Sequence, residues 1–427
     1  MREFQPIAAL AIGAPIDFVI HPAPHLYIVP FKSLIRLKVR IENTDTNALI
    51  VDANRVGPVN CTFHAIFSDV MVEMGGKILN ENTNGLYPFR CYLETLLAGN
   101  QDYKDSVLQI SLWSKDDGAH IDDTEVTHAA NHNEALYKRS LPFRLGRTVE
   151  LCGRPHHDLF EQRLAIPSNV GLKIRLTPAP SSFLLKNVEP DADHPQIPYR
   201  LRILEAILCI HTLEVSAATE LSHLQMLNTK NICIPIRKVE LRQLTIPPHQ
   251  SAANFERVLS GIMPDRLFIF FVTQQSKDGC FFRNPFNLHH RNVNHLAVYV
   301  NGELVNEEAA LTPDFREDRY QYLKAYLGLY RSFSASAFGS RGGGGPCALG
   351  IPYDEYPRGF TVYGFDLSPD GTSGAVKSPL REGSLRVHVG FRDPPTETLC
   401  LIVYAERGFG SCGYELDRFG QVIFTNV

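Results

Sequence analysis

Apolar and polar residues alternate strictly along several short segments of the chain. In residues 34–42 the apolar positions are Ile35, Leu37, Val39 and Ile41, and the residues between them are charged. A period of two places the apolar set on one face of a β-strand and the charges on the other. Residues 170–176, 385–391 and 399–403 repeat the pattern, whereas residues 267–272 are continuously apolar and predict a strand covered on both faces.

Two hairpins of the same design occur in the two halves of the chain. Residues 70–74 alternate into Gly75-Gly76, and residues 296–300 alternate into Asn301-Gly302; a short return strand follows each turn. Gly-Gly and Asn-Gly tolerate the positive φ of a two-residue type I′ turn. A helical stretch comes after each hairpin, with apolar residues at i, i+3, i+4 and i+7. These residues are Phe89, Tyr92, Leu93 and Leu96 in the first half and Leu323, Tyr326, Leu327 and Tyr330 in the second.

The repeated order of hairpin, helix and late alternating strand predicts a tandem β protein. Each helix should bury its apolar stripe against the end of a sheet. Residues 187–198 contain three prolines and three acidic residues and have the composition of a linker. We therefore predict an N-terminal domain at 1–190 and a C-terminal domain at 198–427, each large enough for an eight-stranded sandwich. The 30 glycines and 28 prolines fit an all-β chain, and the glycine-rich segment 339–346 predicts a mobile loop.

Composition removes several classes of function. The formal charge of −4 does not favour binding to nucleic acid, which is itself negatively charged. The sequence contains no run of about 18 apolar residues, so no membrane span is predicted. The N-terminus lacks the basic and apolar regions of a signal peptide, so secretion is not expected. Nine cysteines without a CxxC pair fit neither a disulfide framework nor a zinc module, and we expect reduced thiols. They are Cys61, Cys91, Cys152, Cys209, Cys233, Cys280, Cys347, Cys400 and Cys412.

The glycine-rich and serine-containing turns lack the features of catalytic motifs. The glycines at 342–345 are followed by Pro346-Cys347 and not by the Lys-Ser/Thr of a phosphate loop. Ser411 lacks the G-x-S-x-G spacing of a nucleophile elbow. Both segments are therefore interpreted as turns or loops.

Histidine and aspartate clusters are the remaining candidates for a site. Neighbouring side chains on a strand point to opposite faces, so the two histidines of a neighbouring pair cannot readily bind the same ion. For His156-His157 and His289-His290 we therefore expect solvent-facing or loop histidines. The aspartates at 116–117 and 122–123 match no calcium-loop spacing and predict a solvated acidic loop, although a calcium site or a glycosidase pair is conceivable there. We predict no catalytic, cofactor-binding or metal-binding residue.

Short motifs in a fixed order then connect the sequence with a family. In the first half they are Phe4-Gln5-Pro6-Ile7, Val56-Gly57-Pro58-Val59-Asn60 and Tyr87-Pro88-Phe89-Arg90 running into Tyr92-Leu93-Glu94-Thr95-Leu96-Leu97. In the second half they are Tyr199-Arg200-Leu201, Asn284-Pro285-Phe286-Asn287, Leu296-Ala297-Val298-Tyr299-Val300-Asn301-Gly302, Pro313-Asp314-Phe315, Gly359-Phe360-Thr361, Phe365-Asp366-Leu367 and Ile402-Val403-Tyr404-Ala405-Glu406. Over nearly its whole length the chain resembles the major capsid proteins of Polinton (Maverick) elements and adintovirus-like viruses.

The resemblance implies an all-β fold of two tandem eight-stranded jelly rolls, with short helices in the loops. It implies a structural protein without enzymatic activity or cofactor, located in the virion capsid and assembled inside the host cell. Three copies would form a pseudo-hexagonal capsomer, as in hexon-like shells, and tile an icosahedron around double-stranded DNA. The expected partners are further copies of the chain and penton and minor capsid proteins, without sequence-specific nucleic-acid binding.

Two other functions stay open from the sequence. Jelly rolls also serve as carbohydrate-binding or carbohydrate-cleaving proteins, which need a groove of exposed aromatic residues and a carboxylate pair. The single tryptophan, Trp113, makes an aromatic platform less favourable, although 16 tyrosines could supply one. A capsid protein that a host has taken over for a new cellular role would have the same sequence pattern.

Overall fold

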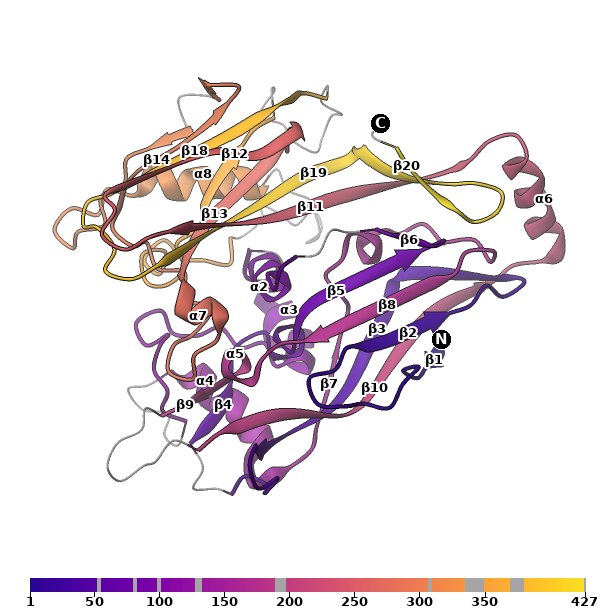
Figure 1. The fold of residues 1–427 in the computed structure, drawn as a ribbon, viewed down its shortest axis with the longest axis horizontal. Coiled ribbons are helices and arrows are strands. Elements are labelled where there is room, and N and C mark those ends of the chain that lie inside the picture. Colours follow the sequence, from indigo (N-terminus) through magenta and orange to yellow (C-terminus); the bar gives the residue numbers. More distant parts are fainter. Residues whose placement is uncertain are drawn as a thin grey trace.

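Antiparallel sheets make up most of the protein, as a computed structural model shows (Figure 1). The structure describes residues 1–51, 55–79, 83–97, 101–126, 133–188, 197–305, 309–334, 349–368 and 380–425. In Figure 1 the first half, in indigo to magenta, lies below the second half, in orange to yellow.

Two four-stranded sheets form the first half. One has the order β1 (Arg2–Phe4), β10 (Tyr199–Glu214), β3 (Leu26–Asn43) and β7 (Val149–Gly153). The other has the order β2 (Ile16–Ile20), β8 (Leu172–Pro178), β5 (Phe67–Met74) and β6 (Lys77–Ile78). A small separate pair consists of β4 (Val56–Pro58) and β9 (Leu185–Asn187).

The second half repeats this plan. One sheet has the order β11 (Ile232–Ile246), β19 (Leu399–Leu416), β13 (Arg266–Thr273) and β17 (Tyr363–Asp366), with β20 (Val422–Thr425) beside β19. The other has the order β12 (Ala252–Ile262), β18 (Glu382–Phe391), β14 (Val293–Val300) and β15 (Glu303–Leu304), with β16 (Ala310–Leu311) beside β14.

The strand order shows that the two halves have the same topology. When β4, β9, β16 and β20 are set aside, eight strands remain in each half. Numbered along the chain, they form sheets of order 1-8-3-6 and 2-7-4-5 in both halves. Paired sheets of eight strands in this arrangement are a jelly roll. The predicted fold of two tandem jelly rolls is therefore confirmed.

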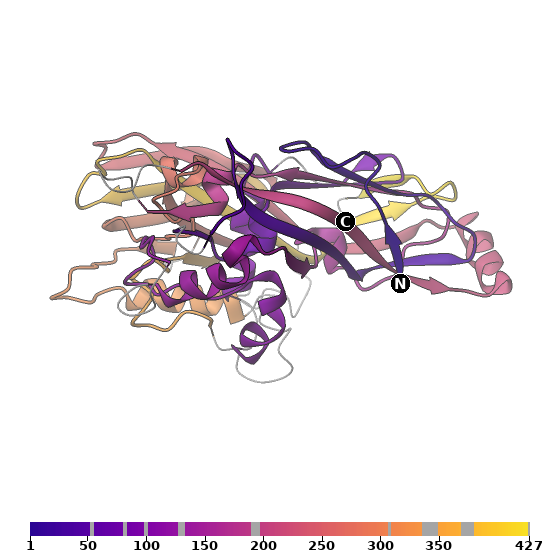
Figure 2. The ribbon, with the colours of Figure 1, turned by 90° about the horizontal axis from the view of Figure 1, so that it is seen from below.

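Short helices occupy the connections between strands. In the first half they are α1 (Thr62–Ala65), α2 (Tyr87–Leu97), α3 (Gln101–Asp105), η1 (Val107–Ser111), α4 (Glu134–Ser140), η2 (Leu141–Gly146), η3 (Asp158–Glu161) and α5 (Ser181–Leu184). In the second half they are α7 (Gln274–Asp278) and α8 (Leu323–Ser334), and α6 (Ala217–Leu227) joins the two halves. Figure 2 shows that most of the longer connections gather on one side of the sheets, and that α6 lies at one end of the molecule.

Local sequence patterns explain the strands and turns. The alternating apolar residues of β3 are buried while Arg36, Lys38 and Arg40 stay partly exposed, and β13 is buried at every position, as predicted. Both hairpin turns have positive φ at their two central residues, which are 56° and 81° at Gly75-Gly76 and 55° and 88° at Asn301-Gly302. The type I′ turns are confirmed.

The two predicted helices exist, but only the first buries the predicted stripe. All residues of α2 are buried. On α8 three of the four residues expected in the core are exposed, with Leu323 55%, Leu327 39% and Tyr330 38% accessible, whereas Tyr326 is half-buried and packs against the core. A second apolar stripe of α8, which contains Ala325, Leu329 and Phe333, is buried instead. The prediction for this face is wrong because α8 carries two apolar stripes and packing against β17 selects one of them.

The strand after the proline-rich segment belongs with the first half. The predicted domains, 1–190 and 198–427, assign β10 to the second half. Its hydrogen-bonded partners are instead β1 and β3, with Cys209 opposite both Glu3 and Leu34. Most of the predicted linker, at residues 187–198, lies outside the described residues.

Candidate functional site

Helix α2 lies between the two jelly rolls and contacts both (Figure 1). Its aromatic residues pack on the second half. Tyr92 stacks on Phe286 with ring centroids 4.3 Å apart, and Phe89 packs 6.3 Å from Phe270 of β13. Because Tyr92 also contacts Trp113, at 5.7 Å, the single tryptophan is buried here and offers no exposed platform for a sugar.

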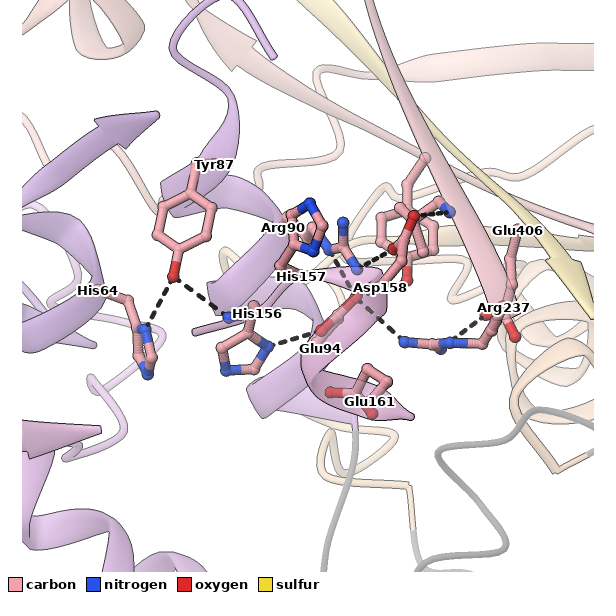
Figure 3. Close-up of polar contacts among 12 residues, drawn as sticks. His64, Tyr87, Arg90, Glu94, His156, His157, Asp158, Glu161, Arg237 and Glu406 are labelled. Carbon is pink, nitrogen blue, oxygen red and sulfur yellow. Dashed lines mark hydrogen bonds and ion pairs between the residues drawn. The ribbon is translucent and has the colours of Figure 1, made fainter. Parts of the chain in front are cut away.

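The polar face of α2 carries a buried ion pair. Arg90 Nε donates to Glu94 Oε1 at 3.0 Å, one helical turn away. Arg90 also donates to Asp158 of η3 at 2.6 Å (Figure 3). Each of the three side chains is at most 5% exposed. Charges removed from water this completely are tolerated only when they are paired and hydrogen-bonded.

Residues of the second half complete this ionic cluster. The Tyr404 hydroxyl donates to Glu94 at 2.8 Å, and Arg237 of β11 donates to the same carboxylate at 3.4 Å. Arg237 also pairs with Glu406 at 3.3 Å, and Arg266 of β13 pairs with Glu406 at 3.0 Å. The chain of contacts therefore runs from α2 of the first jelly roll into the sheet β11-β19-β13 of the second.

The protonation of the cluster follows from its pairing. Burial by itself would raise the pKa of Glu94, but Arg90, His156 and Arg237 together hold that pKa well below its usual value. Burial likewise opposes the charge on Arg90, whereas Asp158 and Glu94 hold its pKa well above the ordinary value. The Glu94 carboxylate is therefore ionised at neutral pH. A buried cluster of ion pairs of this kind holds the elements that contribute to it in register.

The histidines at 156–157 lie in the loop between β7 and η3, in agreement with the prediction of solvent-facing or loop histidines, but their side chains are mostly buried. His157 is 1% exposed, and its Nδ1 accepts a hydrogen bond from the Leu159 amide at 3.1 Å. His156 Nδ1 lies 2.6 Å from Glu94 Oε2, so this side chain joins the ionic cluster. The two rings therefore have different partners. Within the described residues, His156 instead lies with His64 and Cys91, and their ligand atoms are within 4.8 Å of one another.

Two aspartates of the segment 116–123 make contacts with other parts of the chain. Asp116 is 3% exposed and pairs with Arg139 at 2.6 Å, so the prediction of a wholly solvated loop is wrong at this residue. Asp122 accepts the Asn284 amide at 2.8 Å and thereby ties the loop to the second half. Sequence reasoning missed this link because Asn284 is distant in the chain.

Other predicted positions are placed by the structure or fall outside it. The rings of His289 and His290 lie 4.1 Å apart, and His290 stacks on Phe315. The glycine-rich segment 339–346 lies outside the described residues, as does the side chain of Ser411. In the parts of the chain that are described, no helix has the length and apolarity needed to cross a bilayer. The seven described cysteines are free thiols.

The sequence carried one missed signal for the ionic cluster. Arg90 and Glu94 have the i, i+4 spacing of a helical ion pair, and Glu406 comes directly after the apolar run 399–405 of β19. A charged residue next to such an apolar run in one strand indicates a buried, paired side chain.

Comparisons with known proteins address the fold. No protein-family model matches the sequence. A protein of Caenorhabditis elegans, named only as uncharacterized, is 20% identical over 85% of this chain and 83% of its own length. A chain of the Sputnik virophage structure superposes with a TM-score of 0.60 at 9% identity and covers 100% of this chain and 88% of its own.

Two capsid proteins give similar superpositions. The mavirus major capsid protein has a TM-score of 0.55 at 10% identity and covers 100% of this chain and 90% of its own. The Faustovirus major capsid protein has a TM-score of 0.56 at 9% identity, with 95% and 89% covered. The chain has the fold of double jelly-roll capsid proteins. At these identities the likeness concerns the fold, which agrees with the strand order found in both halves.

Proposed function

We propose that this chain is a structural major capsid protein of an icosahedral double-stranded DNA virus or virus-like element. The observation that carries the proposal is the duplicated jelly roll over the whole chain, shared with the mavirus and Faustovirus capsid proteins. Two similar domains in one chain let three chains present six similar corners, which suits a hexagonal lattice. We propose that the capsomer is a homotrimer and that it assembles with penton and minor capsid proteins.

Within that class we propose an element of the Polinton (Maverick) type. The ordered motifs of both halves support this choice, and the relative from a nematode fits an element carried by an animal genome. We further propose domain limits at about residue 214, where β10 ends, and residue 232, where β11 begins. Helix α6 would then be the bridge between the two rolls.

A structural role fits the surface and the interior. The ionisable groups of the central cluster are buried and paired, which is unsuited to binding a substrate. Helix α6 exposes Leu221, Leu224 and Met226, which are 57%, 40% and 64% accessible. Apolar side chains of this size gathered on one exposed helix are typical of a surface that another protein copy covers.

Light scattering coupled to size exclusion, followed by negative-stain microscopy, tests the proposal. We expect particles of about 144 kDa, three times the chain mass of 47.9 kDa, with hexagonal outlines, or closed shells. Obligate interfaces commonly bury more than roughly 2,000 Å², so the trimer should persist at micromolar concentration. A stable monomer at that concentration would overturn the capsid proposal and favour the carbohydrate-binding alternative, which a glycan array would then examine.

A further inference from the structure

Three residues with metal-ligating side chains meet beside the ionic cluster. His64 lies on α1, Cys91 on α2, and His156 on the segment between β7 and η3. One ligand atom from each lies within 4.8 Å of the other two. His64 is 5% and Cys91 0% exposed, and the side chain of His156 is 16% exposed. Nothing in the proposed capsid function requires this arrangement.

Close packing explains how the three residues come together. Helix α1 packs directly on β7, where a Cβ atom at Gly153 would lie 2.5 Å from the Phe63 ring. Glycine at this position therefore allows α1 to bring His64 against the end of β7, from which the chain continues to His156. The two imidazole centroids are 4.6 Å apart at an interplanar angle of 88°.

Tyr87 fixes the two histidines relative to α2. Its hydroxyl lies 3.4 Å from His64 Nδ1 and accepts the backbone N–H of His156 at 3.3 Å (Figure 3). Because Tyr87 lies one helical turn before Cys91, both side chains extend from the same side of α2.

The contact between Glu94 and His156 has the form of a metal-site support. The Nδ1 of His156 lies 2.6 Å from Glu94 Oε2, and a carboxylate oxygen accepts hydrogen bonds, so this contact favours the tautomer with the proton on Nδ1. The lone pair of His156 is then on Nε2, which is free of the Glu94 contact. Histidine ligands of metal ions commonly donate their other ring N–H to a carboxylate in this way, which fixes the tautomer and the ring orientation.

We propose that His64, Cys91 and His156 bind one divalent transition-metal ion of the zinc class, with Glu94 as the positioning residue for His156. Imidazole nitrogen and thiolate sulfur are the ligands that Zn²⁺ prefers, whereas Ca²⁺ and Mg²⁺ require oxygen ligands. A tetrahedral ion with bonds of about 2.0–2.3 Å separates its ligand atoms by roughly 3.3–3.8 Å. Because the ligand atoms now lie within 4.8 Å of one another, they need to approach by at most about 1–1.5 Å to reach that geometry.

The three ligands suit a divalent ion in charge as well as in type. Zinc is bound by neutral imidazoles and by a thiolate, so the thiolate of Cys91 would cancel one of the two positive charges. The ion would fasten α1, α2 and the segment before η3 together.

Metal titration of the full chain tests the site. The protein is freed of metal with a chelator, and Zn²⁺ or Co²⁺ is added in weakly buffered solution at neutral pH. We expect one ion per chain and a thiolate-to-Co²⁺ charge-transfer band in the absorption spectrum. Zn²⁺ should also raise the melting temperature, whereas Mg²⁺ at the same concentration should not.

Matched variants separate this site from other thiols and histidines. Cys91→Ser and His156→Asn should each raise the Kd for Zn²⁺ by about 10-fold to 100-fold or more. Two control variants should bind Zn²⁺ as the natural chain does. Cys400→Ser changes an equally buried cysteine of the second half, and His157→Gln changes the buried histidine next to His156. Trp113 fluorescence reports whether each variant is folded.

The natural chain alone can overturn the proposal. Absence of a stoichiometric Co²⁺ charge-transfer band, or a band that persists in folded Cys91→Ser, would show that the three residues form only a buried polar contact. Because the natural chain gives the decisive spectrum, a variant that fails to fold does not leave the question open. Loss of metal binding would not affect the trimer measurement, so the two proposals fail separately.

Discussion

Glu94→Gln tests the ionic cluster that joins the two jelly rolls. The substitution keeps the size of a side chain that is 2% exposed, so it removes the charge without opening a cavity. The Oε1 of Glu94 accepts hydrogen bonds from Arg90, Arg237 and Tyr404, and its Oε2 contacts His156. Loss of the charge leaves two buried guanidinium groups with one carboxylate fewer. Removing one partner of a buried pair costs about 3–5 kcal/mol of unfolding free energy.

Urea unfolding followed by Trp113 fluorescence measures this cost, since Trp113 packs on Tyr92 of α2. With a denaturant slope of about 3 kcal/mol/M, the midpoint should fall by roughly 1–2 M. Glu134→Gln is the matched control, because Glu134 pairs with Lys138 at 2.9 Å with the same i, i+4 spacing but with both side chains about 60% exposed. That variant should lose below about 1 kcal/mol. If the two variants have the same midpoint, the buried cluster does not join the halves as argued.

Three further changes have signs set by the structure. Gly302→Val should lower the free energy of unfolding by about 1–3 kcal/mol, because a φ of 88° at this position strains a β-branched residue. Gly302→Asn should lower it less, since asparagine tolerates positive φ. If Gly302→Val and the natural chain had equal melting temperatures, the assignment of the turn would be wrong. Burial lowers the pKa of His157 to about 4, so the unfolded chain binds the extra proton and stability should fall by about 3 kcal/mol between pH 6.5 and 4. His157→Gln should flatten that fall in urea titrations at the two pH values, and an unchanged slope would refute the assignment. Burial lowers the pKa of Lys186 to about 7, and its amine donates to the Cys280 carbonyl at 2.7 Å. Lys186→Met removes the buried amine and loses this hydrogen bond, and we expect a net gain of about 2 kcal/mol in the free energy of unfolding at pH 7. A less stable variant would show that the hydrogen bond outweighs the cost of burying the amine.

Features governed by neighbouring residues could be read from the sequence. The period of two in β3 needs only that one face of the strand be buried, and Asn301-Gly302 needs only local backbone sterics. The repeated order of hairpin and helix along the chain indicated the duplication without any knowledge of which strands pair. The same local reasoning could not choose between the two apolar stripes of α8, because burial depends on which stripe meets β17.

Pairing partners and buried charges were decided by the tertiary structure. The proline-rich composition of residues 187–198 predicted a linker, but only the hydrogen bonds to β1 and β3 place β10 beside strands of the first roll. Glu94 and Tyr404 are 310 residues apart in the chain and share one hydrogen bond. His64, Cys91 and His156 come from three different elements. The sequence determined the strands, turns and duplication because those depend on neighbouring residues; the cluster and the metal-ligating trio depend on long-range packing, which creates the low-dielectric interior that gives such contacts their strength.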